Sequence, residues 1–149
     1  MKIVIGSDHG GYAMKEELIS FLKGLKKYDV INMGCFSLDS VDYPDIAVNV
    51  AKEVLREKNT FGILICGTGI GMSMVANKVK GIRCALCSDE YSAEMTRRHN
   101  DANILSLGGR VIGLELAKSI VVKFLESNFD GGRHKDRVNK IISIEEKLC

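Results

Sequence analysis

One stretch of the 149-residue chain constrains the fold more than any other. In residues 61–73, FGILICGTGIGMS, a buried strand runs directly into a glycine-rich loop. Ile63, Leu64 and Ile65 form an unbroken apolar run, which is typical of a strand covered on both faces of a parallel sheet. Residues 72–78 then predict a helix. Strand, loop and helix in this order indicate an α/β fold.

The rest of the chain repeats this alternation. We expect other strands at residues 2–5, 28–33, 82–87 and 104–107, and further helices at about 14–25, 44–55, 89–99, 117–125 and 135–148. In the helix over 44–55, the residues expected on the buried side are Ile46, Ala47, Val50, Val54 and Leu55. The alternation predicts a single α/β domain over residues 1–149, with a five-stranded parallel sheet between two layers of helices.

The loop after the central strand favours a negatively charged ligand. Gly67, Gly69 and Gly71 let successive N–H groups turn inward around oxygens, and the next helix adds the positive end of its dipole. A P-loop is excluded, because the chain has no Gly-Lys-Ser/Thr sequence. The dinucleotide fingerprint has glycine or alanine where Met72 stands. Asp89 nevertheless lies near the distance expected for a ribose-binding carboxylate, so a nucleotide-binding regulatory module stays an alternative.

Cys66 is the candidate reactive residue of this loop. We expect it at the carboxyl end of the central strand, facing the positive field of the loop, where a thiolate is favoured over a thiol. The alternative is structural, because cysteine is among the most buried residue types and often behaves as a small hydrophobe.

Asp8 and His9 follow the first strand, so they should share an edge of the sheet with Cys66. A carboxylate, an imidazole and a thiol beside a glycine nest would make an acid–base site. Alternatively, Asp8 caps the next helix and His9 is a surface loop residue.

Two further groups near the carboxyl half of the chain also have two interpretations. His99 and Asn100 end a predicted helix, where a histidine also stabilises the carbonyl end of the helix. Arg133 and Arg137 are four residues apart and would lie on one helix face, which suits a phosphate. A solvated helix face is the commoner explanation of such a charged run.

The sequence disfavours a metal site. Cys84 and Cys87 fall in a predicted strand, where residues three apart point to opposite faces, so their thiolates are not expected to share one metal. His9, His99 and Cys66 lack the short spacing of typical metal ligands.

Composition narrows the class of protein further. Lys and Arg number 21 against 19 Asp and Glu, so no overall charge indicates nucleic acid or membrane as a partner. No apolar run approaches the ~20 residues of a membrane span, and the first residues enter a strand without a signal peptide. Five cysteines, an odd number without disulfide-framework spacing, suit the reducing cytoplasm.

Together these motifs resemble the type B ribose-5-phosphate isomerase family over nearly the whole chain. The segments that carry the resemblance are GSDHGG at 6–11, DYP at 42–44, GILICGTGIG at 62–71, RHN at 98–100, and GGRH at 131–134 with Arg137. The resemblance implies a Rossmann-like three-layer domain that isomerises ribose 5-phosphate and ribulose 5-phosphate in the non-oxidative pentose phosphate pathway. It also implies no metal or cofactor, and a homodimer or tetramer with active sites shared across the interface. Relatives act on allose or galactose 6-phosphate, so a phosphorylated hexose stays an alternative substrate.

The resemblance also assigns roles to residues. Cys66 corresponds to the base that moves a proton between C1 and C2 of the sugar. One branch of the family uses a glutamate on the following helix instead, but residues 70–74 contain no acid. His99, helped by Asp8, corresponds to the acid–base that opens the sugar ring, and Thr68 with the loop N–H groups to the enediolate-binding group. The implied substrate-binding residues are His9, Tyr43, Gly67, Gly69, Ile70, Gly71, Asn100, Arg110, Arg133 and Arg137.

Chain direction makes a prediction about His99. Its helix starts at the carboxyl edge of the sheet and runs about ten residues, roughly 15 Å, back toward the opposite edge. One chain alone is therefore not expected to bring His99 and Cys66 onto one sugar, whereas a two-fold dimer supplies His99 from the partner.

Overall fold

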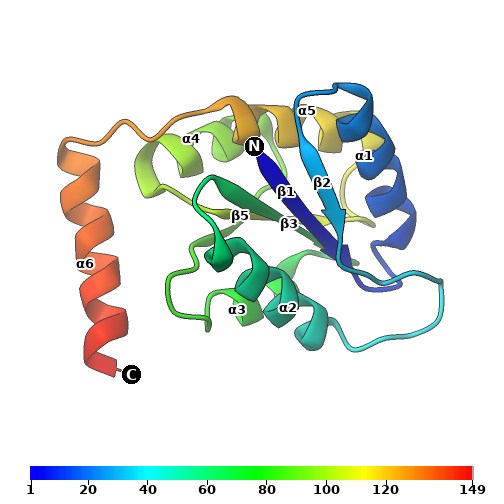
Figure 1. Ribbon diagram of the computed structural model, residues 1–149, viewed down its shortest axis with the longest axis horizontal. Coiled ribbons are helices and arrows are strands. Elements are labelled where there is room, and N and C mark those ends of the chain that lie inside the picture. Colours follow the sequence, from blue (N-terminus) through cyan, green and yellow to red (C-terminus); the bar gives the residue numbers. More distant parts are fainter. Residues whose placement is uncertain (149) are drawn as a thin grey trace.

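The computed structural model describes residues 1–148, so Cys149, one of the five cysteines, lies outside the described residues. Within residues 1–148, five strands form one parallel sheet in the order β2-β1-β3-β5-β4 (Figure 1). The strands are β1 Lys2–Ser7, β2 Asp29–Asn32, β3 Thr60–Cys66, β4 Cys84–Leu86 and β5 Ile104–Gly108. The predicted α/β fold with a parallel sheet is confirmed, and the apolar stretch before the glycine loop is its central strand.

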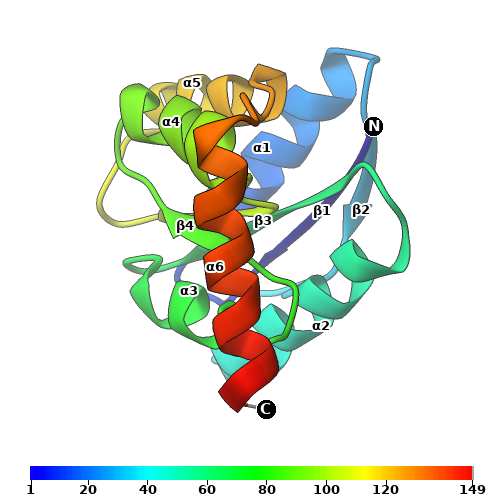
Figure 2. The ribbon, with the colours of Figure 1, turned by 90° about the vertical axis from the view of Figure 1, so that its left-hand side faces the viewer.

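Six helices accompany the sheet in the described part of the chain. They are α1 Tyr12–Gly24, α2 Tyr43–Arg56, α3 Ile70–Ala76, α4 Glu90–Asn100, α5 Leu114–Glu126 and α6 Arg133–Leu148. Figure 2 shows α1, α4 and α5 on one face of the sheet and α2 and α3 on the other. No helix among residues 1–148 combines the length and the apolar character needed to cross a membrane.

Alternate side chains of the strands build a separate core on each face, because successive side chains of a strand point to opposite sides. In β3, Ile63 and Ile65 pack in the core under α1 and α5, whereas Leu64 and Cys66 pack in the core under α2 and α3. The parallel register brings the ends of β1, β3 and β5 to one edge of the sheet, which we call the carboxyl edge.

Several predicted boundaries were wrong by one to three residues; the largest difference is in α5, which begins at Leu114 and not at residue 117. β1 continues through Gly6 and Ser7, because they pair with β3. β4 covers only Cys84–Leu86, since its ladder with β5 extends no further. α3 and α6 begin earlier than predicted, at Ile70 and Arg133.

One predicted core residue was also wrong. Leu55 is 46% exposed, because it lies about 100° around α2 from the buried Val54 and near the end of that helix.

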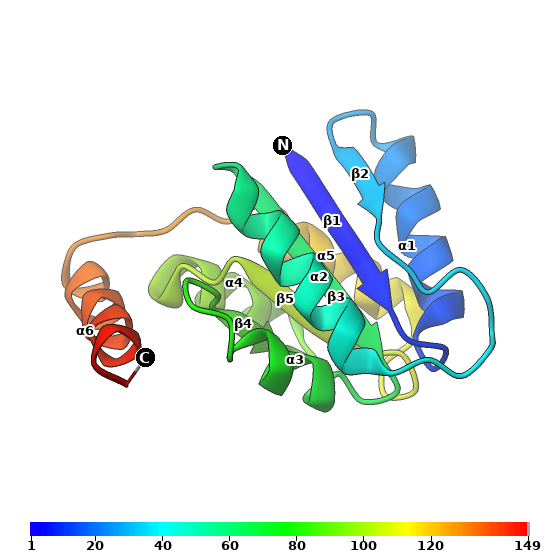
Figure 3. The same ribbon diagram turned by 60° about the horizontal axis from the view of Figure 1, so that its bottom comes forward.

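Helix α6 stands apart from the rest of the molecule, as Figures 1 and 3 show. It is held by the buried Val138 and by the Glu145 carboxylate, which accepts a hydrogen bond from the Gly81 N–H at 3.2 Å. A groove of about 400 Å³ lies between α6 and the β4 side of the body. Ile141 and Ile144 line this groove and remain largely exposed.

Candidate functional site

The predicted site residues fall into two groups within one chain. The first, the carboxyl-edge cluster, consists of Asp8, His9, Tyr43, Cys66, Gly67, Thr68, Gly69, Ile70, Gly71 and Arg110. The second, the α4–α6 cluster, contains the predicted residues His99, Asn100, Arg133 and Arg137, together with Asp130 and His134.

Cys66 ends the central strand of the sheet and is 5% exposed. Its side chain points toward the layer of α2 and α3, and its sulfur accepts a hydrogen bond from the Gly69 N–H at 3.1 Å. The sulfur is thus both packed in the core and held by a backbone donor of the glycine loop. The thiol therefore has the setting of a reactive group as well as that of a packed one.

The shape of the glycine loop is fixed by its neighbours. Gly69 has φ of 77°, and a Cβ there would come within 2.8 Å of the Leu107 backbone, so only glycine fits. Its carbonyl accepts a 2.6 Å hydrogen bond from the fully buried Ser106 hydroxyl. The Thr68 hydroxyl accepts the Ile70 N–H at 3.3 Å, which orders the turn into α3. Ser106, a lone serine in an apolar strand, was not among the predicted site residues.

Two side chains lie on the rim of this loop. The backbone N–H of Arg110 donates to the Gly67 carbonyl at 3.0 Å, and a Cβ at Gly67 would lie 3.7 Å from the Arg110 side chain. The ring of Tyr43 packs against Gly71, where a Cβ would approach the ring to 2.8 Å. These predicted substrate contacts therefore lie together at the carboxyl edge.

The loop after β1 packs against the glycine loop. A Cβ at Gly10 would lie 3.1 Å from the Gly67 nitrogen. Asp8 accepts a hydrogen bond from the Gly11 N–H at 3.1 Å, so its carboxylate orders the start of α1, as the structural alternative predicts. The His9 Nδ1 accepts the Val41 N–H at 3.4 Å, which assigns the proton of a neutral ring to Nε2.

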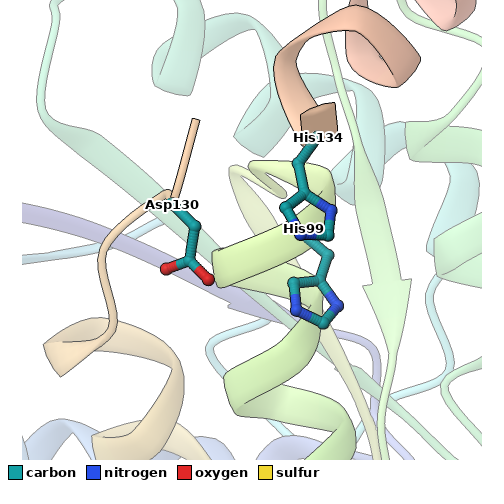
Figure 4. Close-up of side chains that lie close together, drawn as sticks. All are labelled: His99, Asp130 and His134. Atoms are coloured by element: carbon teal, nitrogen blue, oxygen red, sulfur yellow. The ribbon is translucent and has the colours of Figure 1, made fainter. Parts of the chain in front are cut away.

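Figure 4 shows the centre of the α4–α6 cluster, where side chains from α4, from the segment before α6 and from α6 itself meet. The rings of His99 and His134 stack with centroids 4.1 Å apart and planes 3° from parallel. The Asp130 carboxylate lies beside them and receives hydrogen bonds from Arg98 at 3.2 Å. The Arg98 guanidinium lowers the pKa of Asp130.

Further positive charge lies near the stacked rings. Loss of solvent lowers the pKa of His134, and the charges of His99, Arg133 and Arg137 lower it further, whereas Asp130 acts in the opposite direction. A cluster with this excess of cationic groups attracts an anion such as a phosphate.

The same cluster has donor types that bind metals, because one ligand atom each of His99, Asp130 and His134 lies within 4.8 Å of the others. Two observations oppose a metal. The lone pairs of parallel imidazoles do not converge on one point, and the carboxylate is already held by Arg98. The arginines nearby would also repel a dication. No role was predicted for Asp130, which directly precedes the Gly131-Gly132 pair, or for His134, two residues after it.

The two clusters lie at opposite edges of the sheet. Arg83, just before β4, donates hydrogen bonds to the carbonyls of Asn100 at 3.1 Å and Asp101 at 2.9 Å. The end of α4 is thus fixed at the amino edge, whereas Cys66 ends the seven-residue β3 at the carboxyl edge, roughly 20 Å away along the strand. The structure confirms that one chain does not bring His99 and Cys66 together.

Two alternatives from the sequence can now be judged. Cys84 and Cys87 pack on opposite faces of the sheet, as predicted, and burial raises their pKa values to about 12 and about 11. Met72 is fully buried against the sheet. Asp89 caps α4 by accepting the Ser92 N–H at 2.7 Å, and this bond lowers its pKa. The carboxylate that supported a nucleotide-binding module therefore has a structural role.

Comparison with known proteins agrees with this geometry. A family model described as Ribose/Galactose Isomerase matches residues 3–141. The chain is 47% identical to ribose-5-phosphate isomerase B of Escherichia coli over 146 residues, which cover 98% of this chain and 97% of that protein. The solved structure of the Clostridium thermocellum enzyme of that name is 54% identical, with a TM-score of 0.97 and full coverage of both chains. That of the Mycoplasma genitalium enzyme, with bound ribulose 5-phosphate, is 42% identical, with a TM-score of 0.94 and coverage of 99% of this chain and 97% of that chain. This chain is a member of the ribose/galactose isomerase family.

Proposed function

We propose that this chain interconverts ribose 5-phosphate and ribulose 5-phosphate through an enediolate, with Cys66 as the base. Family membership and the similarity to enzymes named ribose-5-phosphate isomerase B support the reaction. The observation that carries the assignment of the base is the 3.1 Å hydrogen bond from the Gly69 N–H to the Cys66 sulfur. This contact supports the assignment, because it joins the sulfur to the glycine loop at the edge of the sheet where ligands of α/β folds bind.

In this proposal the proton moves in two steps. The Cys66 thiolate removes the C2 proton of the open-chain aldose, and the electron pair forms the C1–C2 double bond of the enediolate. The thiol then returns the proton to C1, while the hydroxyl proton passes from O2 to O1, giving the ketose. The Ile70 N–H already donates to the Thr68 hydroxyl, but the next N–H groups of α3, those of Gly71 and Met72, have no partners within the helix, so they are available to the oxygens that gain charge.

The phosphate and the sugar ring require groups from both clusters. We assign the opening of the ring to His99 of a second copy, with Asp8 as its helper. The phosphate grip consists of His9 and Arg110 at the carboxyl edge with Arg133 and Arg137 of the second copy. A two-fold dimer built in this way has two equivalent sites.

Apolar side chains around the carboxyl-edge cluster support a second copy at this edge. Side chains of α3, β4 and the turn after β5 remain exposed there, although apolar groups normally avoid such clustering at a free surface. They are Ile70 at 48%, Met74 at 64%, Leu86 at 44% and Val111 at 60%.

A turnover assay tests the function. The purified chain is given ribose 5-phosphate, allose 6-phosphate and galactose 6-phosphate separately, with a chelator present, and ketose formation is followed. We expect ribose 5-phosphate to give the highest kcat/KM. A clear preference for either hexose phosphate would replace the proposed substrate, and no turnover of any of the three would reject the isomerase assignment.

Ligand-dependent melting tests the nucleotide alternative, because only a ligand that binds the folded chain raises the melting temperature. We expect stabilisation by ribose 5-phosphate and none by NAD or ATP.

The four described free cysteines, Cys35, Cys66, Cys84 and Cys87, support a reducing compartment such as the cytoplasm.

A further inference from the structure

The described residues include one charged side chain with no exposure at all, that of Lys15 in the first turn of α1. Lysine is almost never fully buried unless it is paired, because removing an ammonium group from water is costly. The reaction proposed above gives this lysine no role.

The ammonium group of Lys15 is surrounded by acceptors. It donates to the Asn32 side-chain carbonyl at 3.0 Å and to the Cys35 backbone carbonyl at 2.6 Å, and it pairs with the Glu16 carboxylate at 2.6 Å. The centroids of two aromatic rings, Tyr12 and Phe36, lie 5.1 Å and 5.5 Å from its nitrogen. The contacts therefore join α1 to the end of β2 and to the segment after it.

That segment, residues 33–42, is neither helix nor strand, and both of its ends are held. At its start, the Asn32 carbonyl that binds Lys15 also accepts the Gly34 N–H at 3.1 Å. At its far end, the Val41 N–H donates to His9, and the next element begins with Tyr43. Two predicted substrate contacts, His9 and Tyr43, thus depend on the course of this segment.

We propose that Lys15 is a positioning residue that fixes segment 33–42, so that His9 and Tyr43 meet the substrate. Ordering a segment without regular secondary structure costs conformational entropy, which a few strong contacts must offset. Lys15 supplies such contacts from a rigid helix. This inference rests on the proposed isomerase function, since its kinetic consequence is a change in substrate binding.

Lys15→Met tests the inference, because methionine keeps the apolar length of the side chain and removes the charge and the donors. We expect KM for ribose 5-phosphate to rise about tenfold or more while kcat changes less than about threefold, since the affected contacts bind substrate and Cys66 is untouched. Hydrogen exchange should become faster in residues 33–42 and stay unchanged in β3. Lys23→Met, at an exposed position of the same helix, is the matched control and should leave both measurements as in the wild type.

Lys15→Arg keeps the charge and hydrogen-bond donors, so it should recover part of the lost affinity. Unchanged exchange across residues 33–42 in Lys15→Met overturns the inference whatever the kinetics, and so does an unchanged KM. If Lys15→Met does not fold, Asn32→Ala removes the shared acceptor and is judged by the same two measurements. Absence of turnover in the wild type would reject the proposed function instead, whereas the exchange measurement would still report on the anchor.

Discussion

The cysteine side chains of this chain differ in what surrounds the sulfur. Cys66 accepts a backbone N–H at the end of a strand, beside a loop that can hold oxygens. Cys84 and Cys87 are desolvated, and burial raises their pKa values to about 12 and about 11. Both thiols therefore stay almost entirely protonated at pH 8. Reactivity should therefore distinguish them.

Cys66→Ala should lower kcat by orders of magnitude and leave folding and phosphate binding largely unchanged, because only the proton carrier is lost. Iodoacetamide should inactivate the wild type, ribose 5-phosphate should protect it, and mass spectrometry at pH 8 should find Cys84 and Cys87 unmodified. Near-normal turnover in Cys66→Ala would show that another group is the base.

Lys15 shows what a sequence does not reveal about a single residue. Its neighbours in the chain give an ordinary amphipathic helix, in which a lysine is expected to face solvent. Its partners Asn32 and Cys35 are 17 and 20 residues away, and only the packing of β2 beside β1 brings them to it. By contrast, Cys66 is recognisable from the sequence, because an apolar strand and three glycines surround it locally.

At the scale of elements, the alternation of strands and helices was predictable, because each buried face leaves an apolar period in the sequence. The ends of elements were less so. Ser7 belongs to β1 because it pairs with Ile65 of β3. The sequence of residues 2–11 alone does not predict this pairing. The separation of the two clusters was predictable from the length and direction of α4. The stacking of His99 with His134 was not, because it depends on where α6 begins.

We expect phosphate binding to depend on the first turns of α6. Arg137→Ala should raise KM for ribose 5-phosphate strongly with a smaller effect on kcat, because hydrogen bonds between guanidinium and phosphate are among the stronger ones. Lys140→Ala, one turn further along the same helix, is the control. An unchanged KM in Arg137→Ala would show that Arg137 is a solvated helix residue that does not bind the phosphate.

Thr60, the first residue of β3, lowers the free energy of unfolding through a buried hydroxyl that a substitution can remove. The Thr60 hydroxyl is buried and is the one such side-chain atom without a hydrogen-bond partner in the described part of the chain. A buried unsatisfied group costs about 1–3 kcal/mol, so Thr60→Val, which keeps the shape, should raise the free energy of unfolding by about 1 kcal/mol. Thr60→Ser keeps the hydroxyl and should give no such gain. Urea unfolding measures both, and a destabilised Thr60→Val would imply a partner for the hydroxyl.

For the whole molecule, the two clusters make a prediction about mixed assemblies. Cys66→Ala and His99→Ala should each be inactive, but subunit exchange between them should form hybrids with one site whose Cys66 and His99 are both intact. With equal mixing, half of the dimers are hybrids and each has one active site of two, so roughly a quarter of wild-type activity should return. Zero recovery, with subunit exchange proven by mass spectrometry, would contradict the shared site.

The proposed shared site also predicts how the catalytic rate depends on protein concentration. If His99 of one chain completes the Cys66 site of its partner, as proposed, an isolated chain holds two half-sites and no whole one. Once the protein is diluted well below the dissociation constant of the dimer, the initial rate should fall with the square of the total concentration. In an enzyme with such a shared site, the specific activity is proportional to the fraction of chains that are in dimers.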